Sequence, residues 1–445
     1  MAFKDIRKSR KWLSVEEIRI IAAFLILLSA VLVLNVYVAR SLQGGEWLLV
    51  RWNGVRTYLG LQAAASDSLK AWRSMPDGEV TIHLDQPELY GAEIARRVQQ
   101  IVYGRDAFAN EYRYILNDPF YIVLLYIPLA FFSDFSIVRG IWMLVAETAL
   151  FMSVLFSFWL SEWSPPRGLS VLLVGFGVFG FFSLNALVTT SPAILLNFLY
   201  LGVLLALRSF SDELAGGLLF LAAYQWEVGG LFFLFVIIFV IANRRWGVLA
   251  GFGMALIVML IVSFLVEPGW GLPYFRAVLS NLIQGASLNL GQILSAWFPE
   301  VRFPIGGAVS ALLVAVVFIE SLRAVDAHFR RVVWTASLAL AAMPLTGLAI
   351  FPSNYVVLLL PLVLVISLIW ERWLRRRLIV VTLVFLAALI VPFALYIQTV
   401  WEYAPFYTEL LYVLPPLATI LALYWMRWWV VHSPRIWADQ IGNRR

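Results

Sequence analysis

The chain has 445 residues, of which 62% are hydrophobic and only 13% are charged, and its mean hydropathy is +0.85. A soluble domain of this length cannot bury so much apolar side chain, so the composition excludes an ordinary soluble protein and predicts an integral membrane protein. The net charge of +6 does not indicate nucleic-acid binding, because lysine and arginine gather in short segments between apolar runs, as in the cytoplasmic loops of membrane proteins.

The first apolar run, residues 18–39, is long enough to cross a bilayer, since about 20 helical residues span the hydrocarbon core. It is too long for the apolar part of a secretory signal, and no small-residue cleavage motif follows it. The residues before it are strongly basic: Lys4, Arg7, Lys8, Arg10 and Lys11. We therefore expect an uncleaved first span with the N-terminus in the cytoplasm.

The remaining apolar runs predict an all-α polytopic protein with about 12 transmembrane helices. We expect residues 1–445 to form a single integral domain in the plasma membrane. After the first span they cover 119–133, 136–160, 168–187, 190–207, 214–242, 246–266, 304–322, 332–350, 354–370, 378–397 and 410–430. The basic segments near 244, 323–331, 372–377 and 427 then all fall in cytoplasmic loops, and both termini are cytoplasmic. The run 214–242 is long for one span and carries Gln225, Trp226 and Glu227, so a broken helix with reassigned neighbours is the alternative.

Two segments are left outside the membrane by this topology: 40–117, the first extracytoplasmic loop, and 267–303, the second. The first contains an amphipathic pattern from Leu89 to Val102, with apolar residues at helical spacing and Arg96 and Arg97 opposite them. We expect a helix there that lies on the outer leaflet, with the basic pair facing lipid phosphates.

Polar residues that point to chemistry concentrate at this outer face. Asp85 and Glu88 precede the amphipathic helix, where a carboxylate either stabilises the positive helix end or acts as a general base. At the expected mouth of the second span stand Tyr112, Arg113, Tyr114 and Asp118, which either form an ordinary interfacial belt and helix start or bind a sugar linked to a lipid phosphate.

Within the expected spans, Glu147 and Glu227 are the deepest ionisable residues. Charges in the hydrocarbon region are costly, so such residues are functional candidates. Glu227 is favoured because its polar neighbours interrupt the apolar run, whereas Glu147 has the alternative of a hydrogen-bonded structural role. The chain has no cysteine, which excludes disulfides, thiolate metal sites and cysteine nucleophiles.

The layout resembles the GT-C membrane glycosyltransferases, and most of all the bacterial polyprenyl-phosphate-mannose-dependent mannosyltransferases. The segment 85–108 is similar to their pattern of an acid, a tyrosine, small residues and Gly-x-Asp-x-aromatic, through Asp85 or Glu88, Tyr90, Ala92, Gly104, Asp106 and Phe108. The segment 112–142 resembles the next stretch through Tyr112, Tyr114, Pro119, Pro128, Leu129, Ala130 and Trp142. Gln86 stands where the family's acid is usual, which makes Glu46, just after the first span, a third candidate acid.

The resemblance implies an inverting transfer of a hexose such as mannose from a polyprenyl-phosphate donor to a glycan or glycolipid acceptor in the cell envelope. The catalytic candidates are Asp85, Glu88 and Glu46, and the substrate-binding candidates are Tyr90, Arg105, Tyr112, Arg113, Tyr114, Asp118, Glu227, Arg276 and Arg302. The expected partners are the bilayer, the lipid-linked sugar and the acceptor, not nucleic acid. No metal site is indicated, and a divalent-metal requirement is left open. The alternatives are a lipid or amphiphile transporter or flippase, and a ligase or polymerase of surface polysaccharide.

Overall fold

The computed structural model describes residues 15–73, 89–104, 118–284, 289–300, 305–346, 351–373, 376–402 and 405–431. Every regular element in these ranges is a helix, which confirms the all-α prediction. Seven helices in the described ranges are long and apolar enough to cross a membrane, or eight if the bent pair formed by the first two helices is one span. The count of 12 spans stays a prediction.

The helices are listed here in chain order. They are α1 (Val15–Ser41), α2 (Glu46–Arg73), α3 (Ala92–Tyr103), α4 (Phe120–Val123), α5 (Ile127–Ala130), α6 (Phe135–Leu160), α7 (Arg167–Phe179), α8 (Phe181–Val188), α9 (Ala193–Arg208), α10 (Asp212–Ala222), α11 (Trp226–Ala242), α12 (Trp246–Val266), α13 (Gly271–Gln284), α14 (Leu290–Trp297), α15 (Ile305–Arg323), α16 (Phe329–Ala342), η1 (Met343–Leu345), η2 (Pro352–Leu358), α17 (Leu359–Arg372), α18 (Arg377–Glu402) and α19 (Pro405–Val431).

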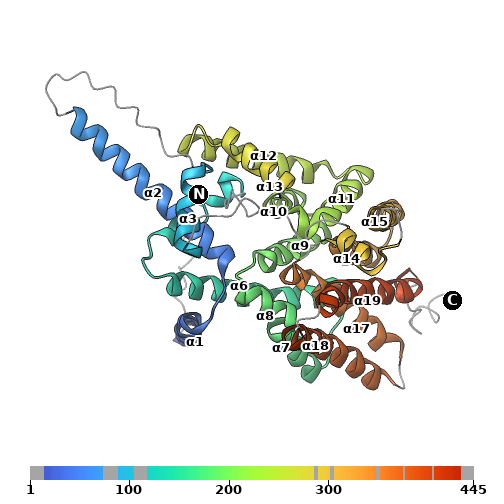
Figure 1. Ribbon diagram of the computed structural model, residues 1–445. Coiled ribbons are helices and arrows are strands. Elements are labelled where there is room, and N and C mark those ends of the chain that lie inside the picture. Colours follow the sequence, from blue (N-terminus) through green and yellow to red (C-terminus); the bar gives the residue numbers. More distant parts are fainter. Residues whose placement is uncertain are drawn as a thin grey trace, which may run out of the picture.

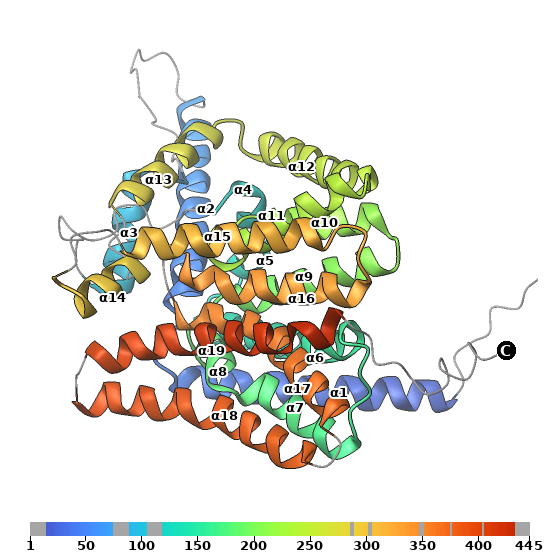
Figure 2. The same cartoon turned by 90° about the vertical axis from the view of Figure 1, so that its right-hand side faces the viewer.

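The long apolar helices run roughly side by side, and the polar helices lie across one end of them. Figure 2 shows α1, α15, α16, α18 and α19 along one direction, with α2, α3 and α13 gathered where α1 finishes. We call the end of the bundle where α2, α3 and α13 lie the α2 end. The first residues of α1 and the last residues of α19 both point to the other end of the bundle, which we call the opposite end.

A sharp bend between α1 and α2 creates this arrangement. The two helix axes meet at 96°, and Gly44 and Gly45 between them have φ values of +87° and +83°, which favour glycine. The buried Arg139 of α6 donates hydrogen bonds to the carbonyl oxygens of Leu42 at 2.8 Å and Val188 at 2.6 Å. Because Arg139 satisfies carbonyls at two chain turns, it fixes the bend from which α2 runs outward beside α3 (Figure 1).

The predicted second span is not one continuous helix. It consists of the short helices α4 and α5, and Pro128, which lacks an amide donor, occupies the first turn of α5. Both ends of the segment contact α2: Asp118 pairs with Arg51, and the carbonyl oxygen of Leu129 accepts a hydrogen bond from Trp52 at 3.1 Å. The segment therefore starts and finishes at the α2 end, and the prediction of a single span there is wrong.

The predicted span 214–242 is broken, as the alternative reading required. Helices α10 and α11 are separated at residues 223–225 and form a helical hairpin. Asp212, at the start of α10, accepts a hydrogen bond from Arg245, just beyond α11, at 3.1 Å. Near the tip, Phe220 contacts Tyr121 with ring centroids 4.9 Å apart. The start of α10 and the residues after α11 therefore lie close together, and the tip of the hairpin contacts the α4–α5 segment that lies beside α2.

The contact between α10 and α12 depends on glycine. A Cβ atom on Gly251 would lie 2.2 Å from the carbonyl oxygen of Glu213, whereas a Cβ on Gly253 would meet nothing within 4 Å. Small residues let apolar helices approach closely, so we expect Gly251→Ala to lower the free energy of unfolding by about 1–3 kcal/mol. Denaturation in detergent micelles measures this, with Gly253→Ala as the matched control. Equal effects of the two substitutions would contradict the close approach.

Candidate functional site

The centre of the α2 end is a buried ion pair between Arg51 of α2 and Asp118. Their side chains are 7% and 4% exposed. The Nε of Arg51 donates to Oδ2 of Asp118, and Nη2 donates to Oδ1 at 3.2 Å, so the pair is bidentate. The guanidinium also lies 4.0 Å from the ring centroid of Trp47, one turn earlier in α2. This pair joins α2 to the start of α4.

Tyr90, which precedes α3, contacts the same residue. Its hydroxyl donates a hydrogen bond to the backbone carbonyl oxygen of Asp118 at 2.7 Å. Burial, followed by the charge of Asp118, raises the pKa of Tyr90 well above its ordinary value, so the phenol stays protonated and remains a donor. Two residues singled out in the sequence, 28 positions apart, are thereby brought into direct contact.

Aromatic side chains from five segments surround this centre. Trp47 contacts Tyr126 and Trp142, with ring centroids 5.9 and 5.4 Å apart. On the other side, Tyr274 of α13 contacts Tyr90 at 5.5 Å and Trp270 at 5.6 Å. These rings belong to one buried apolar cluster. Through these ring contacts α13, which belongs to the second predicted outer segment, packs against the first predicted outer segment.

A second polar contact ties α2 to the end of α12. Glu267, which is partly exposed, accepts hydrogen bonds at Oε2 from the hydroxyl of Tyr58 and from the amide of Gln62, the latter at 3.2 Å. Tyr58 and Gln62 follow Arg51 by 7 and 11 positions, so the three lie on one face of α2. The hydrogen bonds from α2 to Asp118 and to Glu267 that are described above all come from this face.

Beside this face, an open groove runs between α2 and α3. Its volume is about 630 Å³, and its lining residues are Thr57, Gly60, Leu61, Arg97, Gln100 and Ile101. The groove combines two aliphatic side chains with an arginine and an amide, which suits a molecule that has both an apolar and an anionic part.

The amphipathic helix predicted in this region is confirmed as α3. Its apolar residues Ile94, Ala95 and Val98 are buried against the protein, and Arg96 and Arg97 are exposed. The helix is expected from the sequence to lie on the outer leaflet, but its apolar residues pack against α2 and its neighbours. That the basic pair faces lipid phosphates stays a prediction.

The predicted site residues fall into three groups. Seven lie outside the described residues: Asp85, Glu88, Arg105, Tyr112, Arg113, Tyr114 and Arg302. Tyr90 and Asp118 meet at the buried centre. Glu46, in the first turn of α2, Glu227, in the first turn of α11, and Arg276, on α13, are exposed. The carboxylate of Asp118 is engaged in the ion pair with Arg51, and this pair fixes α2 in place.

The sequence reasoning missed three residues of the site: Arg51, Tyr58 and Glu267. A signal was present, because Arg51, Tyr58 and Gln62 recur at helical spacing within the segment treated as a loop. Glu147, by contrast, has the hydrogen-bonded role that was the alternative to a functional one. Asn35 of α1 donates a hydrogen bond to its carboxylate at 3.0 Å.

Within the described ranges, no group of three or more histidine, aspartate or glutamate side chains is arranged to hold a metal ion. Comparisons with protein families, with curated proteins and with solved structures find no match for the chain.

Proposed function

We propose that this protein transfers a sugar from a polyprenyl-phosphate donor to a glycan or glycolipid acceptor at the outer face of the plasma membrane. In this proposal the α2 end faces outward, both termini are cytoplasmic and the chain crosses the bilayer 12 times, with α10 and α11 as two crossings. The observation that supports it best is that Glu267, the buried aromatic cluster around Asp118 and the α2–α3 groove gather at one end of an apolar helical bundle. A lipid-linked substrate reaches such a site from within the leaflet.

The proposed reaction needs a base and a cation. The base removes the proton of an acceptor hydroxyl, whose oxygen then attacks the anomeric carbon from the side opposite the lipid phosphate. The bond between the anomeric carbon and the phosphate oxygen breaks, and the phosphate leaves with the electron pair, which inverts the anomeric centre. Arginine suits the leaving phosphate, and Arg97, Arg276 and Arg302 are the candidates.

Among the described carboxylates at this end, Glu267 is the best supported base. Both of its hydrogen bonds are accepted by Oε2, and neither uses Oε1. Tyr58 and Gln62 orient the carboxylate, as a base that acts on a bound hydroxyl requires. Asp118 is a poor base because Arg51 holds it in a buried, bidentate pair. Asp85, Glu88 and Glu46 remain the bases that the family resemblance favours.

The arrangement supports a transferase over the transporter alternative. A transporter concentrates polar groups near mid-membrane along a path. Here most of the described acidic residues stand near helix ends or in the turns between helices, and Glu147, which lies within α6, is engaged by Asn35.

The proposal is tested by deleting the gene and profiling lipid-linked and cell-envelope glycans. The deletion is expected to remove one glycan and to accumulate a polyprenyl-phosphate sugar, and the wild-type gene should restore both. A gene encoding Glu267→Gln should fail to restore them, whereas Glu162→Gln, at the opposite end, should succeed. Unchanged glycans in the deletion strain would refute a transferase.

A further inference from the structure

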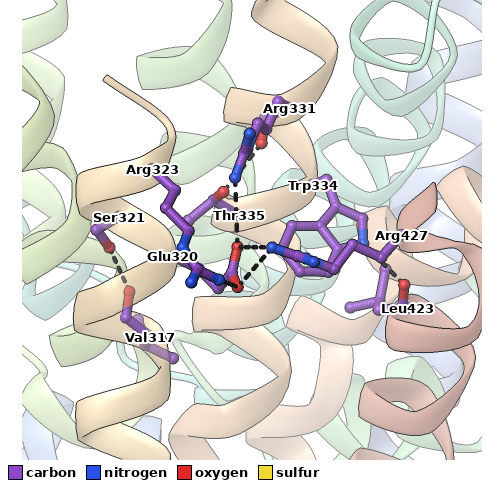
Figure 3. Close-up of polar contacts among 9 residues, drawn as sticks. All are labelled: Val317, Glu320, Ser321, Arg323, Arg331, Trp334, Thr335, Leu423 and Arg427. Atoms are coloured by element: carbon purple, nitrogen blue, oxygen red, sulfur yellow. Dashed lines mark hydrogen bonds and ion pairs between the residues drawn. The ribbon is translucent and has the colours of Figure 1, made fainter. Parts of the chain in front are cut away.

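A second charged cluster lies at the opposite end of the bundle, around Glu320 of α15 (Figure 3). The carboxylate is 5% exposed and accepts hydrogen bonds from Arg427 of α19 at 2.9 and 3.1 Å and from Arg323 at 3.0 Å. Arg331 of α16 is 3.7 Å away. Three helices therefore bring three guanidinium groups to a single carboxylate.

The charge of this cluster is not balanced. Three arginines and one glutamate leave an excess of two positive charges. The other ion pairs in the part of the chain described at this end are one to one: Arg208 with Glu162, Arg245 with Asp212 and Arg330 with Glu371. Arginines that serve only to orient a membrane protein need not converge on one point. The convergence indicates an anionic ligand.

The excess charge is accessible. The side chains of Arg323 and Arg427 are 56% and 32% exposed. Helix stability favours Arg323, in the last turn of α15, but it does not explain Arg331, which stands in the first turn of α16, where a cation opposes the helix dipole. The Nε atoms of Arg331 and Arg427 are also buried and have no hydrogen-bond partner. The guanidinium groups are thus only partly satisfied by Glu320.

The surroundings of the cluster are typical of the level of lipid headgroups. On α19, Trp425 and Trp428 are exposed on either side of Arg427 along the chain, and exposed tryptophans near the end of an apolar helix are typical of a membrane interface. The ring of Trp334 lies below the guanidinium of Arg427, with 5.8 Å between the carbon of the guanidinium and the ring centroid. Arginines at such an interface bind phosphate oxygens.

We propose that Arg323, Arg331 and Arg427 bind the phosphate of an anionic phospholipid headgroup in the leaflet at the opposite end. Phosphatidylglycerol is a lipid of this chemistry, with one negative charge on its phosphate. The site needs only that the bundle is embedded in a bilayer, so it stands apart from the proposed sugar transfer. Headgroup binding there would tie α15, α16 and α19 together through their common carboxylate.

Native mass spectrometry of the full chain in detergent tests this with phosphatidylglycerol and phosphatidylcholine of identical acyl chains. The wild type is expected to retain phosphatidylglycerol preferentially, and Arg323→Gln should weaken that retention about fivefold. Arg323 is chosen because it is exposed and its loss leaves Glu320 paired. Arg208→Gln, which breaks a one-to-one pair at the same end, is the control and should bind like the wild type.

Three outcomes would overturn the assignment. Equal retention of the two lipids by the wild type, or undiminished retention by Arg323→Gln, would exclude a headgroup site at this cluster. Displacement of phosphatidylglycerol by millimolar inorganic phosphate would assign the cluster to a free anion instead of a lipid. By contrast, tighter binding by folded Glu320→Gln, which raises the local excess from two to three charges, would support the electrostatic basis of the site.

Discussion

Replacing Asp118 by asparagine is expected to lower the free energy of unfolding by about 3–5 kcal/mol, because the guanidinium of Arg51 would be left buried without its counter-charge. The pair is almost inaccessible and bidentate, and Trp47 covers the guanidinium, so water cannot readily replace the lost carboxylate. Thermal and chemical denaturation in detergent or nanodiscs measure the loss. The α2 end should lose its order first, since this pair joins α2 to the start of α4.

Two controls separate the buried charge from a general effect of substitution. The double variant Arg51→Met with Asp118→Leu removes both charges and is expected to recover most of the lost stability. Arg208→Gln breaks an exposed pair with Glu162 and should change stability by less than about 1 kcal/mol. If Asp118→Asn were no more destabilising than Arg208→Gln, the buried pair would not be what holds α2.

The apolar runs of the sequence predicted the helical class and most helix positions, but not which runs cross the bilayer. A segment buried in protein and a segment facing lipid are both apolar, so hydropathy does not distinguish them. The segment 119–133 shows this, because it is apolar and still packs against α2 instead of crossing the bilayer. The structure resolves that segment into α4 and α5, with both ends at α2.

The centre of the candidate site was only half predictable. Tyr90 and Asp118 are candidates from the sequence because they are polar residues near an expected membrane surface. Their contact is a hydrogen bond to the backbone carbonyl of Asp118, and a pattern of side chains does not predict such a bond. Arg51 and Glu267 act through partners 67 and 209 positions away in the sequence. Such pairings follow from the bend at Gly44 and the packing of α12 against α4, and one sequence does not determine them.

Glu267→Gln is expected to reduce the rate of sugar transfer by about 10²–10⁴-fold, the usual effect of removing a general base. Glutamine keeps the shape and accepts the hydrogen bond of Tyr58, so folding should be little changed. Tyr58→Phe removes the orienting donor and keeps the base, and it should slow transfer less. The assay uses a synthetic polyprenyl-phosphate sugar with membranes from the deletion strain, and thermal melting of each variant confirms that it is folded.

The acids of the first loop provide the decisive comparison. Asp85→Asn, Glu88→Gln and Glu46→Gln are assayed with the same donor, and each should retain more activity than Glu267→Gln if Glu267 takes the proton. A full loss in Asp85→Asn with near wild-type transfer in Glu267→Gln would move the base to the first loop and leave Glu267 as a structural partner of Tyr58. Because a general base must be deprotonated, the true base variant should also flatten the acidic limb of the pH–rate profile, which a variant that only disturbs α2 would leave in place.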